Sequence, residues 1–295
     1  MDLSIIILSF NTRDLLADLM DSLRESDLGG ISHETIVVDN GSEDGTQDML
    51  KKQYRHIRLV ENNNNFGFSR ANNIGGRFAK GKYLLFLNSD MRVEKDAIKK
   101  LFDYSRINNG FAGGTAKLVL ENGKMDPACH RGFPTPLNSL SYFCGLERIF
   151  AKSRTLGGYH QGWKDLSKPH EVDCISGACF LIKKELFDRL GGWDESFFMY
   201  GEDLDFSYRL KQSGYKLFYF PDAKIIHYKK KSGREKKSNK YSAQNKNNIK
   251  TKTKTKEQFF YTMELFYKKH YKNKYPKLVY KLVLLGIKIV SKVKS

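Results

Sequence analysis

The first hundred residues alternate between short apolar runs and segments whose apolar residues recur at helical spacing. Short runs rich in β-branched and aromatic residues predict strands at 3–10, 34–40, 57–62 and 82–90. Apolar residues spaced three or four apart predict helices at 12–26, 45–53, 69–79 and 94–107, the first with Thr12 as a candidate N-cap. This alternation is typical of an α/β fold with a mostly parallel, Rossmann-like central sheet and helices on both faces.

The pattern loosens after Gly110. Residues 111–120 predict a further strand, whereas 121–169 contain four of the six prolines and little periodicity. A long irregular stretch inside a compact domain is typical of a functional loop. Regular patterning returns over 176–228, where we expect a strand, a helix, a loop through Trp193, a helix from about Glu202 and two more strands.

Polar residues follow three of the predicted strands. They are Ser9-Phe10-Asn11, Asp39-Asn40 and Asn88-Ser89-Asp90. In parallel α/β sheets the carboxyl ends of strands form the ligand-binding edge, so we expect these clusters to line one site. The first strand–helix junction lacks GxGxxG and no GxxxxGK[ST] occurs, which disfavours a dinucleotide enzyme and a P-loop NTPase.

Charge divides the chain. The net charge is +18, and residues 228–295 hold 21 of the 51 basic residues but only three of the 33 acidic ones, which leaves 1–227 neutral. We therefore expect a globular domain at 1–228, a basic flexible linker at 229–257 and a basic amphipathic helical segment at 258–295.

The apolar stretch near the C-terminus, 278–290, is interrupted by lysines and is too short to span a bilayer. Lysines beside a Leu/Ile/Val face suit an interfacial helix on an anionic membrane surface, which is the interpretation we favour. The alternative is that this helix packs on the body. No nucleic-acid recognition motif is present, so we expect no nucleic-acid partner.

The four cysteines fit neither a disulfide framework nor paired CxxC metal spacing, and the N-terminus lacks the basic region of a signal peptide. These features indicate reduced thiols in a cytoplasmic protein, which the basic tail would hold peripherally at the inner face of the membrane.

Several residues are candidates for chemistry. Glu202, Asp203 and Asp205 open a predicted helix, where acids either favour the helix dipole or supply a general base. Asp90 and His227, at predicted strand ends, are candidate ligands for Mg²⁺ or Mn²⁺. A lone histidine there is also compatible with a structural role.

Five motifs occur in the order found in one enzyme family: "SIIILSFN", "IVVDNGSEDGT", "NNFGFSRANNIG", "YLLFLNSD" and the stretch from "SGACFLIKKELF" through "GEDLDFSYRL" to "DAKIIH". Over 1–228 the chain resembles inverting family 2 glycosyltransferases of the GT-A fold, and within them the rhamnosyltransferase-like branch. The resemblance implies a nucleotide-sugar donor and a saccharide or lipid-linked acceptor, as in polysaccharide biosynthesis.

The resemblance also implies roles for individual residues. Those matching the family's nucleotide-binding positions are Ser9, Phe10, Asn11, Asp39, Asn40, Gly67 and Asn73. Those matching the positions beside the donor sugar and diphosphate are Asn88, Ser89 and Asp90. Those on the acceptor side are Gly177, Ala178, Trp193 and Glu202.

In this resemblance Asp203 is the catalytic base, Asp90 binds the divalent metal, Mn²⁺ or Mg²⁺, and His227 completes metal or diphosphate binding. Two positions depart from the family pattern, because Asn88 replaces the first Asp of the DxD motif and Asn72 replaces an Arg. Both departures are familiar among enzymes resembling dTDP-rhamnose users, beside which a UDP-hexose donor stays open.

The sequence therefore predicts an inverting, metal-dependent glycosyltransferase that acts by single displacement. Two rival hypotheses remain at this point. One is a nucleotidyltransferase of similar architecture, and the other is a non-catalytic protein that binds membranes or nucleic acid.

Overall fold

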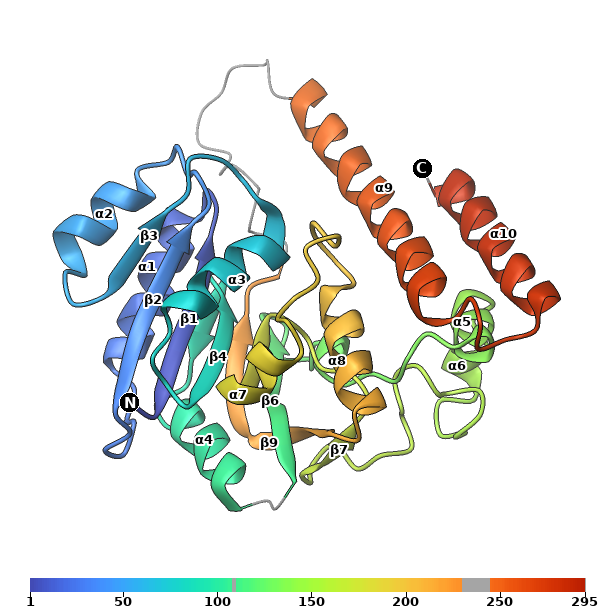
Figure 1. Cartoon of the computed structure of the whole chain (residues 1–295), viewed down its shortest axis with the longest axis horizontal. Helices are drawn as coiled ribbons and strands as arrows, with labels where there is room; N and C mark the ends of the chain where they lie inside the picture. Colours follow the sequence, from blue (N-terminus) through green and yellow to red (C-terminus); the bar gives the residue numbers. More distant parts are fainter. Residues whose placement is uncertain (108–109, 230–244, 295) are drawn as a thin grey trace.

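The computed structural model describes the backbone of residues 1–107, 110–229 and 245–294, and their side chains except those of 245–256 and 293–294. One mixed sheet forms its centre, with the strand order β3-β2-β1-β4-β8-β6-β9-β5 and β7 paired to β9 (Figure 1). The first half of the sheet consists of β1 (Leu3–Ser9), β2 (His33–Asp39), β3 (Arg58–Glu61) and β4 (Tyr83–Asn88). These four strands run parallel to one another.

Helices cover both faces of this half, which explains why β1 and β4 are nearly continuous apolar runs. The helices here are α1 (Arg13–Arg24), α2 (Thr46–Gln53), α3 (Gly67–Phe78) and α4 (Ala97–Ile107). The register pairs Ser9 with Asp39 and Leu8 with Asn88. The three polar clusters therefore meet at one edge of the sheet, and the α/β fold with a mostly parallel sheet is confirmed.

The second half of the sheet is mixed. Its strands are β5 (Met91–Val93), β6 (Phe111–Leu120), β7 (His170–Val172), β8 (Cys179–Lys183) and β9 (Lys216–His227). β8 runs antiparallel to both β4 and β6, whereas β9 runs parallel to β6. We expected two strands over the segment that forms β9. The structure has one, with a register shift between Phe220 and Lys224, where Pro221 cannot donate to the ladder.

The irregular stretch at 121–169 forms short helical turns around one end of the sheet. They are the 3-10 turn Pro127–Cys129, α5 (Pro136–Phe143) and α6 (Leu146–Ile149). Two further helices follow, α7 (Lys184–Arg189) and α8 (Glu202–Gln212). The first turn of α8 carries the Glu202-Asp203 pair, so the helix start fixes where both carboxyl groups lie.

The C-terminal segment is a pair of adjacent helices, α9 (Asn245–His270) and α10 (Lys277–Lys294) (Figure 1). The expected flexible linker was placed at 229–257. Its residues 230–244 lie outside the described part, and 245–257 belong to α9, so the helix begins earlier than predicted. Phe266 and Tyr267 of α9, and Tyr271 just after it, are buried in a second hydrophobic core with Phe197 and Tyr208 of the body. The helix at 278–290, for which packing on the body was the alternative, lies within α10, and its Ile287 is buried in the same second core.

Candidate active site

A cavity of about 570 Å³ lies at the carboxyl edge of the sheet, between the body and α9. Its walls include the end of β4, residues of the irregular stretch between Asp126 and Tyr159, the loops before β8 and α8, and the inner face of α9. Seven of the predicted site residues line this cavity. They are Asn88, Asp90, Gly177-Ala178, Glu202, Asp203 and His227.

The metal candidates meet at one end of this cavity. His227 Nε2 lies 3.5 Å from Asp90 Oδ1, and its Nδ1 lies 2.8 Å from Asp126 Oδ2. Asp126 also accepts a hydrogen bond from Lys229 at 2.7 Å. Although burial lowers it, the two carboxylates raise the pKa of His227 to about 9. Asp126 fixes the ring so that Nε2 faces Asp90, the arrangement of a carboxylate-oriented metal ligand.

No group of three or more His, Cys, Asp or Glu side chains converges to hold a metal within the described residues. Two side chains, one carboxylate and one imidazole that would release its Nε2 proton to solvent on metal binding, nevertheless fit a divalent ion that takes its other ligands from a diphosphate and water. Mg²⁺ in particular is commonly held by one or two carboxylates plus substrate phosphates. The donor set is thus compatible with the predicted ion.

Asp203 lies in the first turn of α8 and is held by three donors. Its Oδ2 accepts hydrogen bonds from Arg131 Nη2 at 2.6 Å and from the Gly177 N–H at 3.2 Å. Its Oδ1 accepts one from the Leu204 N–H at 2.8 Å. Both side chains of the Arg131–Asp203 pair are nearly buried. The carboxylate is therefore oriented on the cavity wall from two elements distant in sequence.

Glu202 differs from its neighbour. It is buried, and its Oε2 has no hydrogen-bond partner among the described residues. Burial and the nearby Asp203 charge raise the pKa of Glu202 to about 8. At neutral pH the Glu202 carboxyl is therefore largely protonated and can donate a hydrogen bond to a ligand.

Asp39, on the predicted nucleotide side, also has a buried carboxylate oxygen that could bind a ligand. Its Oδ1 accepts hydrogen bonds from the Ser42 N–H and Gln47 Nε2, whereas its buried Oδ2 has no partner in the described part of the chain. A buried carboxylate oxygen without a partner is costly unless a ligand satisfies it. This geometry suits the predicted contact with a ribose or a base.

The polar residues at the end of β1 hold the adjoining loops. Asn11 has φ of 53°, its side-chain oxygen accepts a hydrogen bond from the Glu43 N–H, and its own N–H donates to Ser42 Oγ. Ser9 Oγ lies 3.1 Å from Thr12 Oγ1, and the latter donates to Ser89 Oγ at 2.8 Å. Thr12 is the N-cap residue of α1, as predicted, but it makes no side-chain capping bond, because its hydroxyl bonds Ser9 and Ser89 at the ends of β1 and β4 instead.

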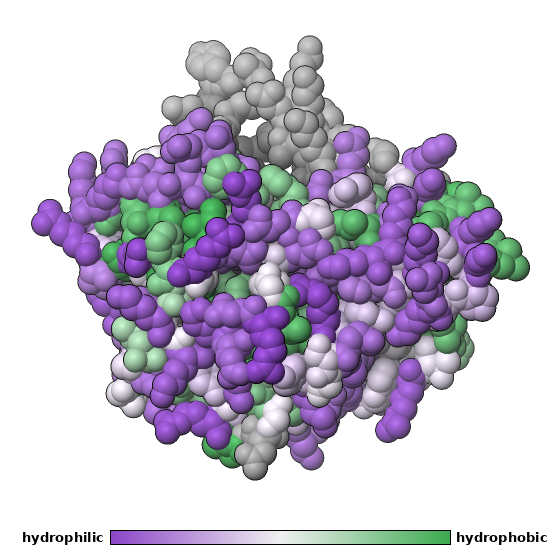
Figure 2. All heavy atoms as spheres, in the orientation of Figure 1, coloured by the Kyte–Doolittle hydropathy of each residue, from purple (hydrophilic) through white to green (hydrophobic). Residues whose placement is uncertain are grey.

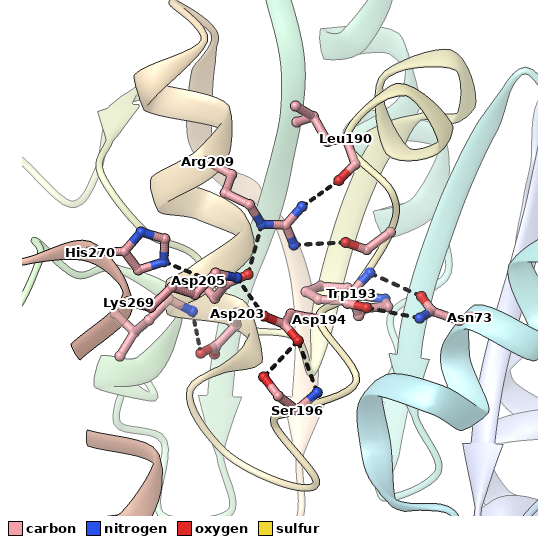
Figure 3. A network of polar contacts seen from close by, with 12 residues as sticks. Asn73, Leu190, Trp193, Asp194, Ser196, Asp203, Asp205, Arg209, Lys269 and His270 are labelled. Atoms are coloured by element: carbon pink, nitrogen blue, oxygen red, sulfur yellow. Dashed lines mark hydrogen bonds and ion pairs between the residues drawn. The ribbon is translucent and has the colours of Figure 1, made fainter. Parts of the chain in front are cut away.

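Three other predicted nucleotide residues act as scaffold in the structure. The Asn40 side chain bonds Asn62, Asn65 and the Phe66–Gly67 backbone. Gly67 has φ of 79°, and a Cβ there would lie 2.3 Å from the Phe198 carbonyl oxygen. Asn73 bonds the backbone of Trp193 in both directions (Figure 3). Neither Phe10, which is 37% exposed, nor any other residue of the predicted nucleotide set lines the cavity within the described residues.

On the acceptor side, Gly177 permits close packing, since a Cβ there would lie 3.0 Å from the Phe68 ring. Trp193, predicted to contact the acceptor, is 1% exposed and packs edge-on against Phe86 and Phe180 in the main core. Trp193 therefore lies in the main core and is not among the residues that line the cavity.

A charged network joins α9 to the helix that carries Asp203. Lys269 Nζ and His270 Nε2 of α9 lie 2.6 and 2.7 Å from Asp205 Oδ1, and Arg209 binds Asp205 Oδ2 from within α8 (Figure 3). Although burial opposes it, His270, Arg209 and Lys269 lower the pKa of Asp205 to about 2. These contacts fix α9 against the start of α8.

Sequence reasoning missed three contributors to the site: Arg131, Asp126 and the inner face of α9. Arg131 and Asp126 lie in the irregular stretch whose length signalled a functional loop. No periodicity or motif assigned either residue a position there. The sequence shows that Phe259, Met263 and Phe266 recur at helical spacing. It does not show which surface they pack against.

The comparisons with known proteins agree with this geometry. Residues 4–191 match the family described as Glycosyl transferase family 2, which is more than half of the chain. The chain belongs to glycosyl transferase family 2. As a member of that family it is a glycosyltransferase, which removes the nucleotidyltransferase and non-catalytic alternatives. Residues 158–231 also match a family described as N-terminal domain of galactosyltransferase.

Similar family members include two named rhamnosyltransferases. The N-acetylglucosaminyl-diphospho-decaprenol L-rhamnosyltransferase of Mycobacterium tuberculosis is 28% identical over 66% of this chain and 66% of its own length. Rhamnosyltransferase WbbL of Escherichia coli K12 is 26% identical over 76% of this chain and 82% of its own length. The chain thus spans slightly less than two thirds of the mycobacterial relative.

Two solved structures share the fold. GalNAc-T7 with UDP, GalNAc and Mn²⁺ aligns with a TM-score of 0.58 at 18% identity, over 77% of this chain and 44% of that one. S. aureus TarS 1–349 aligns with a TM-score of 0.56 at 17% identity, over 96% of this chain and 69% of that one. These alignments confirm the GT-A fold of this family 2 glycosyltransferase.

Proposed function

We propose that this glycosyltransferase moves a sugar from a nucleotide-diphospho-sugar to a hydroxyl of a glycan or lipid-linked saccharide by single displacement with inversion. The observation that carries the proposal is one cavity lined both by Asp90 and His227 and by Glu202 and Asp203. A site of this kind needs to neutralise a departing diphosphate and to remove a proton from an acceptor hydroxyl, and the two pairs suit these two tasks.

In the proposed mechanism Asp203 accepts the proton of the acceptor hydroxyl as that oxygen attacks the anomeric carbon. Arg131 and the Gly177 N–H orient the carboxylate, so its position is set before the acceptor arrives. Glu202, protonated at neutral pH, donates a hydrogen bond to an acceptor oxygen. The displacement leaves the anomeric centre inverted and needs no enzyme nucleophile.

Asp90 and His227 would hold a divalent ion, Mn²⁺ or Mg²⁺. When bound, such an ion neutralises the charge that develops on the diphosphate leaving group. Asp126 keeps His227 Nε2 turned toward Asp90, and α9 walls off part of the cavity from water. In a drier cavity each of these charge interactions is stronger.

For the donor we propose a dTDP-rhamnose or UDP-hexose type of nucleotide sugar. Asn88 stands where many relatives have a carboxylate, and Asn72 stands where they have an arginine. The Asn72 side chain bonds the Phe68 carbonyl within α3, so it adds no charge to the donor side. Similarity to two named rhamnosyltransferases favours the rhamnose donor.

For the acceptor we propose a lipid-linked saccharide, as the name of the mycobacterial relative specifies for that enzyme. None of the described helices is long and apolar enough to cross a membrane. The basic tail would instead hold the protein peripherally on the cytoplasmic face of an anionic membrane.

The exposed face of α10 supports this placement. Its exposed apolar residues share one stripe, each 53–70% exposed: Leu278, Leu282, Leu285 and Ile289. The residues that pack toward α9 lie on the opposite side of the helix: Val283, Leu284, Ile287 and Val290. Beside the exposed stripe lies a row of exposed lysines: Lys277, Lys281, Lys288 and Lys292. Figure 2 shows hydrophobic side chains at the edge of the molecule where α10 lies, among hydrophilic ones.

The test is a panel of nucleotide sugars incubated with the protein and Mn²⁺ or Mg²⁺, scored for release of UDP, dTDP or GDP. The proposal expects that one class of donor releases its nucleoside diphosphate, and that dTDP-rhamnose gives the fastest release. If no nucleotide sugar yields a nucleoside diphosphate with either ion, the proposed donor chemistry is wrong.

A further inference from the structure

The cavity extends beyond the catalytic carboxyl groups along α9. On that side its wall includes Phe259, Met263 and Phe266 of α9, and Pro134 and Phe143 line the same cavity. These side chains are apolar or aromatic, in contrast to the carboxyl-rich end at Asp90 and Asp203. We call this part, together with Met199 and Tyr200, the apolar arm.

Three hydroxyl groups on this side, those of Thr262, Tyr267 and Ser139, are engaged within the protein. Thr262 Oγ1 donates to the Phe259 carbonyl at 2.9 Å, and Tyr267 O–H donates to the Pro134 carbonyl at 2.6 Å. Ser139 Oγ lies 3.2 Å from the same Tyr267 oxygen. A sugar ring placed here would find these three hydroxyl groups occupied and would bury its own hydroxyl groups at a cost in free energy. A hydrocarbon chain has no polar groups and would avoid this cost.

The apolar arm opens to solvent at its rim, where Phe259 is 45% exposed and Met199 and Tyr200 are 37% and 39% exposed. A ligand in the arm can therefore extend out of the protein while its other end stays near Asp203. The helix that builds the arm packs against α10, whose exposed Leu and Ile stripe and lysine row suit a membrane surface carrying negative charge.

We propose that the apolar arm is the subsite for the hydrocarbon chain of a lipid-linked acceptor, next to the phosphate that joins chain and sugar. This inference rests on the proposed function, because the arm opens into the cavity assigned to sugar transfer. It makes α9 part of the substrate site: α9 selects the acceptor by its lipid, while the loops before β8 and α8 contact its sugar.

The test uses three probes with one headgroup and growing chains: dimethylallyl, geranyl and farnesyl phosphate, with five, ten and fifteen carbons. Calorimetric titration of the full chain should give a dissociation constant at least about tenfold lower for farnesyl than for dimethylallyl phosphate, since each buried methylene adds affinity. Met263→Gln and, separately, Phe259→Ser should abolish this chain-length dependence. Tyr261→Ser, on the same helix but exposed and off the cavity wall, should keep it.

Two results would overturn the inference. One is equal affinity of the wild-type protein for all three probes. The other is a dependence that survives both arm variants but is lost in Leu282→Glu/Leu285→Glu, since the chain would then bind on the outer face of α10. Donor hydrolysis by the wild-type protein, measured in parallel, separates this failure from that of the proposed function. Thermal unfolding of each variant establishes that it is folded.

Discussion

Arg131 Nη2 lies 2.6 Å from Asp203 Oδ2, with the two side chains only 11% and 13% exposed. The pair joins the irregular stretch after β6 to the first turn of α8. A buried carboxylate hydrogen-bonded to a buried guanidinium is held in one orientation. The protein thus positions its candidate base through a residue 72 positions away in the sequence.

Arg131→Met should destabilise the protein and abolish most of its activity. Removing one partner of a buried ion pair leaves the other charge uncompensated, at a cost of about 3–5 kcal/mol in the free energy of unfolding. Adding Asp203→Asn should restore most of that stability but none of the activity. Urea unfolding of both variants checks this, and unchanged stability of Arg131→Met would refute the structural importance of the pair.

Glu202→Gln should change how stability depends on pH. The pKa of Glu202 rises from 4.5 to about 8 on folding. Below pH 4.5 the group is therefore protonated in both the folded and the unfolded state, and its ionisation does not lower the free energy of unfolding. As the pH rises toward 8 the unfolded chain ionises while the folded protein keeps its proton, and wild-type stability falls. The variant should therefore gain up to about 4 kcal/mol over wild type between these limits. Parallel unfolding curves at pH 5 and pH 8 that show no difference in this gain would contradict the assignment.

Glu202→Gln also separates the two acids in catalysis. A glutamine keeps the hydrogen-bond donor of a protonated Glu202, so at pH 7 we expect nucleoside diphosphate release within about tenfold of wild type. A loss as complete as that expected for Asp203→Asn would move the role of base to Glu202.

Metal removal should abolish transfer reversibly. We expect EDTA to stop nucleoside diphosphate release and added Mn²⁺ or Mg²⁺ to restore it, because Asp90 and His227 suit a divalent ion. Asp90→Asn should require at least about tenfold more metal for half-maximal activity. Asp222→Asn, an exposed aspartate on the same strand as His227, is the matched control and should behave as wild type. Full activity in EDTA would exclude the ion.

The α10 stripe should decide membrane binding. Leu282→Glu/Leu285→Glu should reduce sedimentation with vesicles that contain anionic lipid by at least about tenfold, because it removes apolar area and adds repulsion. Tyr261→Glu adds the same kind of charge at an exposed position on α9 and should have a smaller effect. Equal binding of the stripe variant and wild type would place the membrane contact elsewhere.

Much of the fold followed from local patterning. Except for the short strand β5, which was not predicted, the strand and helix order up to β6 was predicted with boundaries shifted by a few residues, because buried parallel strands and amphipathic helices are specified by short stretches of chain. The last part of the body was predicted as two strands, whereas it forms the single strand β9, which tolerates Pro221 at a register shift.

The candidate site was only partly accessible from sequence. Asp90, Glu202 and Asp203 stand at predicted element ends, and the structure brings them into one cavity with His227. Trp193, Asn40 and Asn73 pack or bond within the scaffold, which composition cannot distinguish from ligand contact. Arg131 and α9 reach the site through tertiary contacts, and no local signal encodes those.

The central claim is that Asp203 removes the acceptor proton while the donor is held elsewhere in the cavity. The most direct measurement is therefore the Asp203→Asn variant, assayed for both transfer and donor binding. We predict at least about a thousandfold loss of acceptor-dependent nucleoside diphosphate release. The dissociation constant for the nucleotide sugar should stay within about threefold of wild type, since the donor contacts remain. Transfer at more than about a tenth of the wild-type rate would contradict the account.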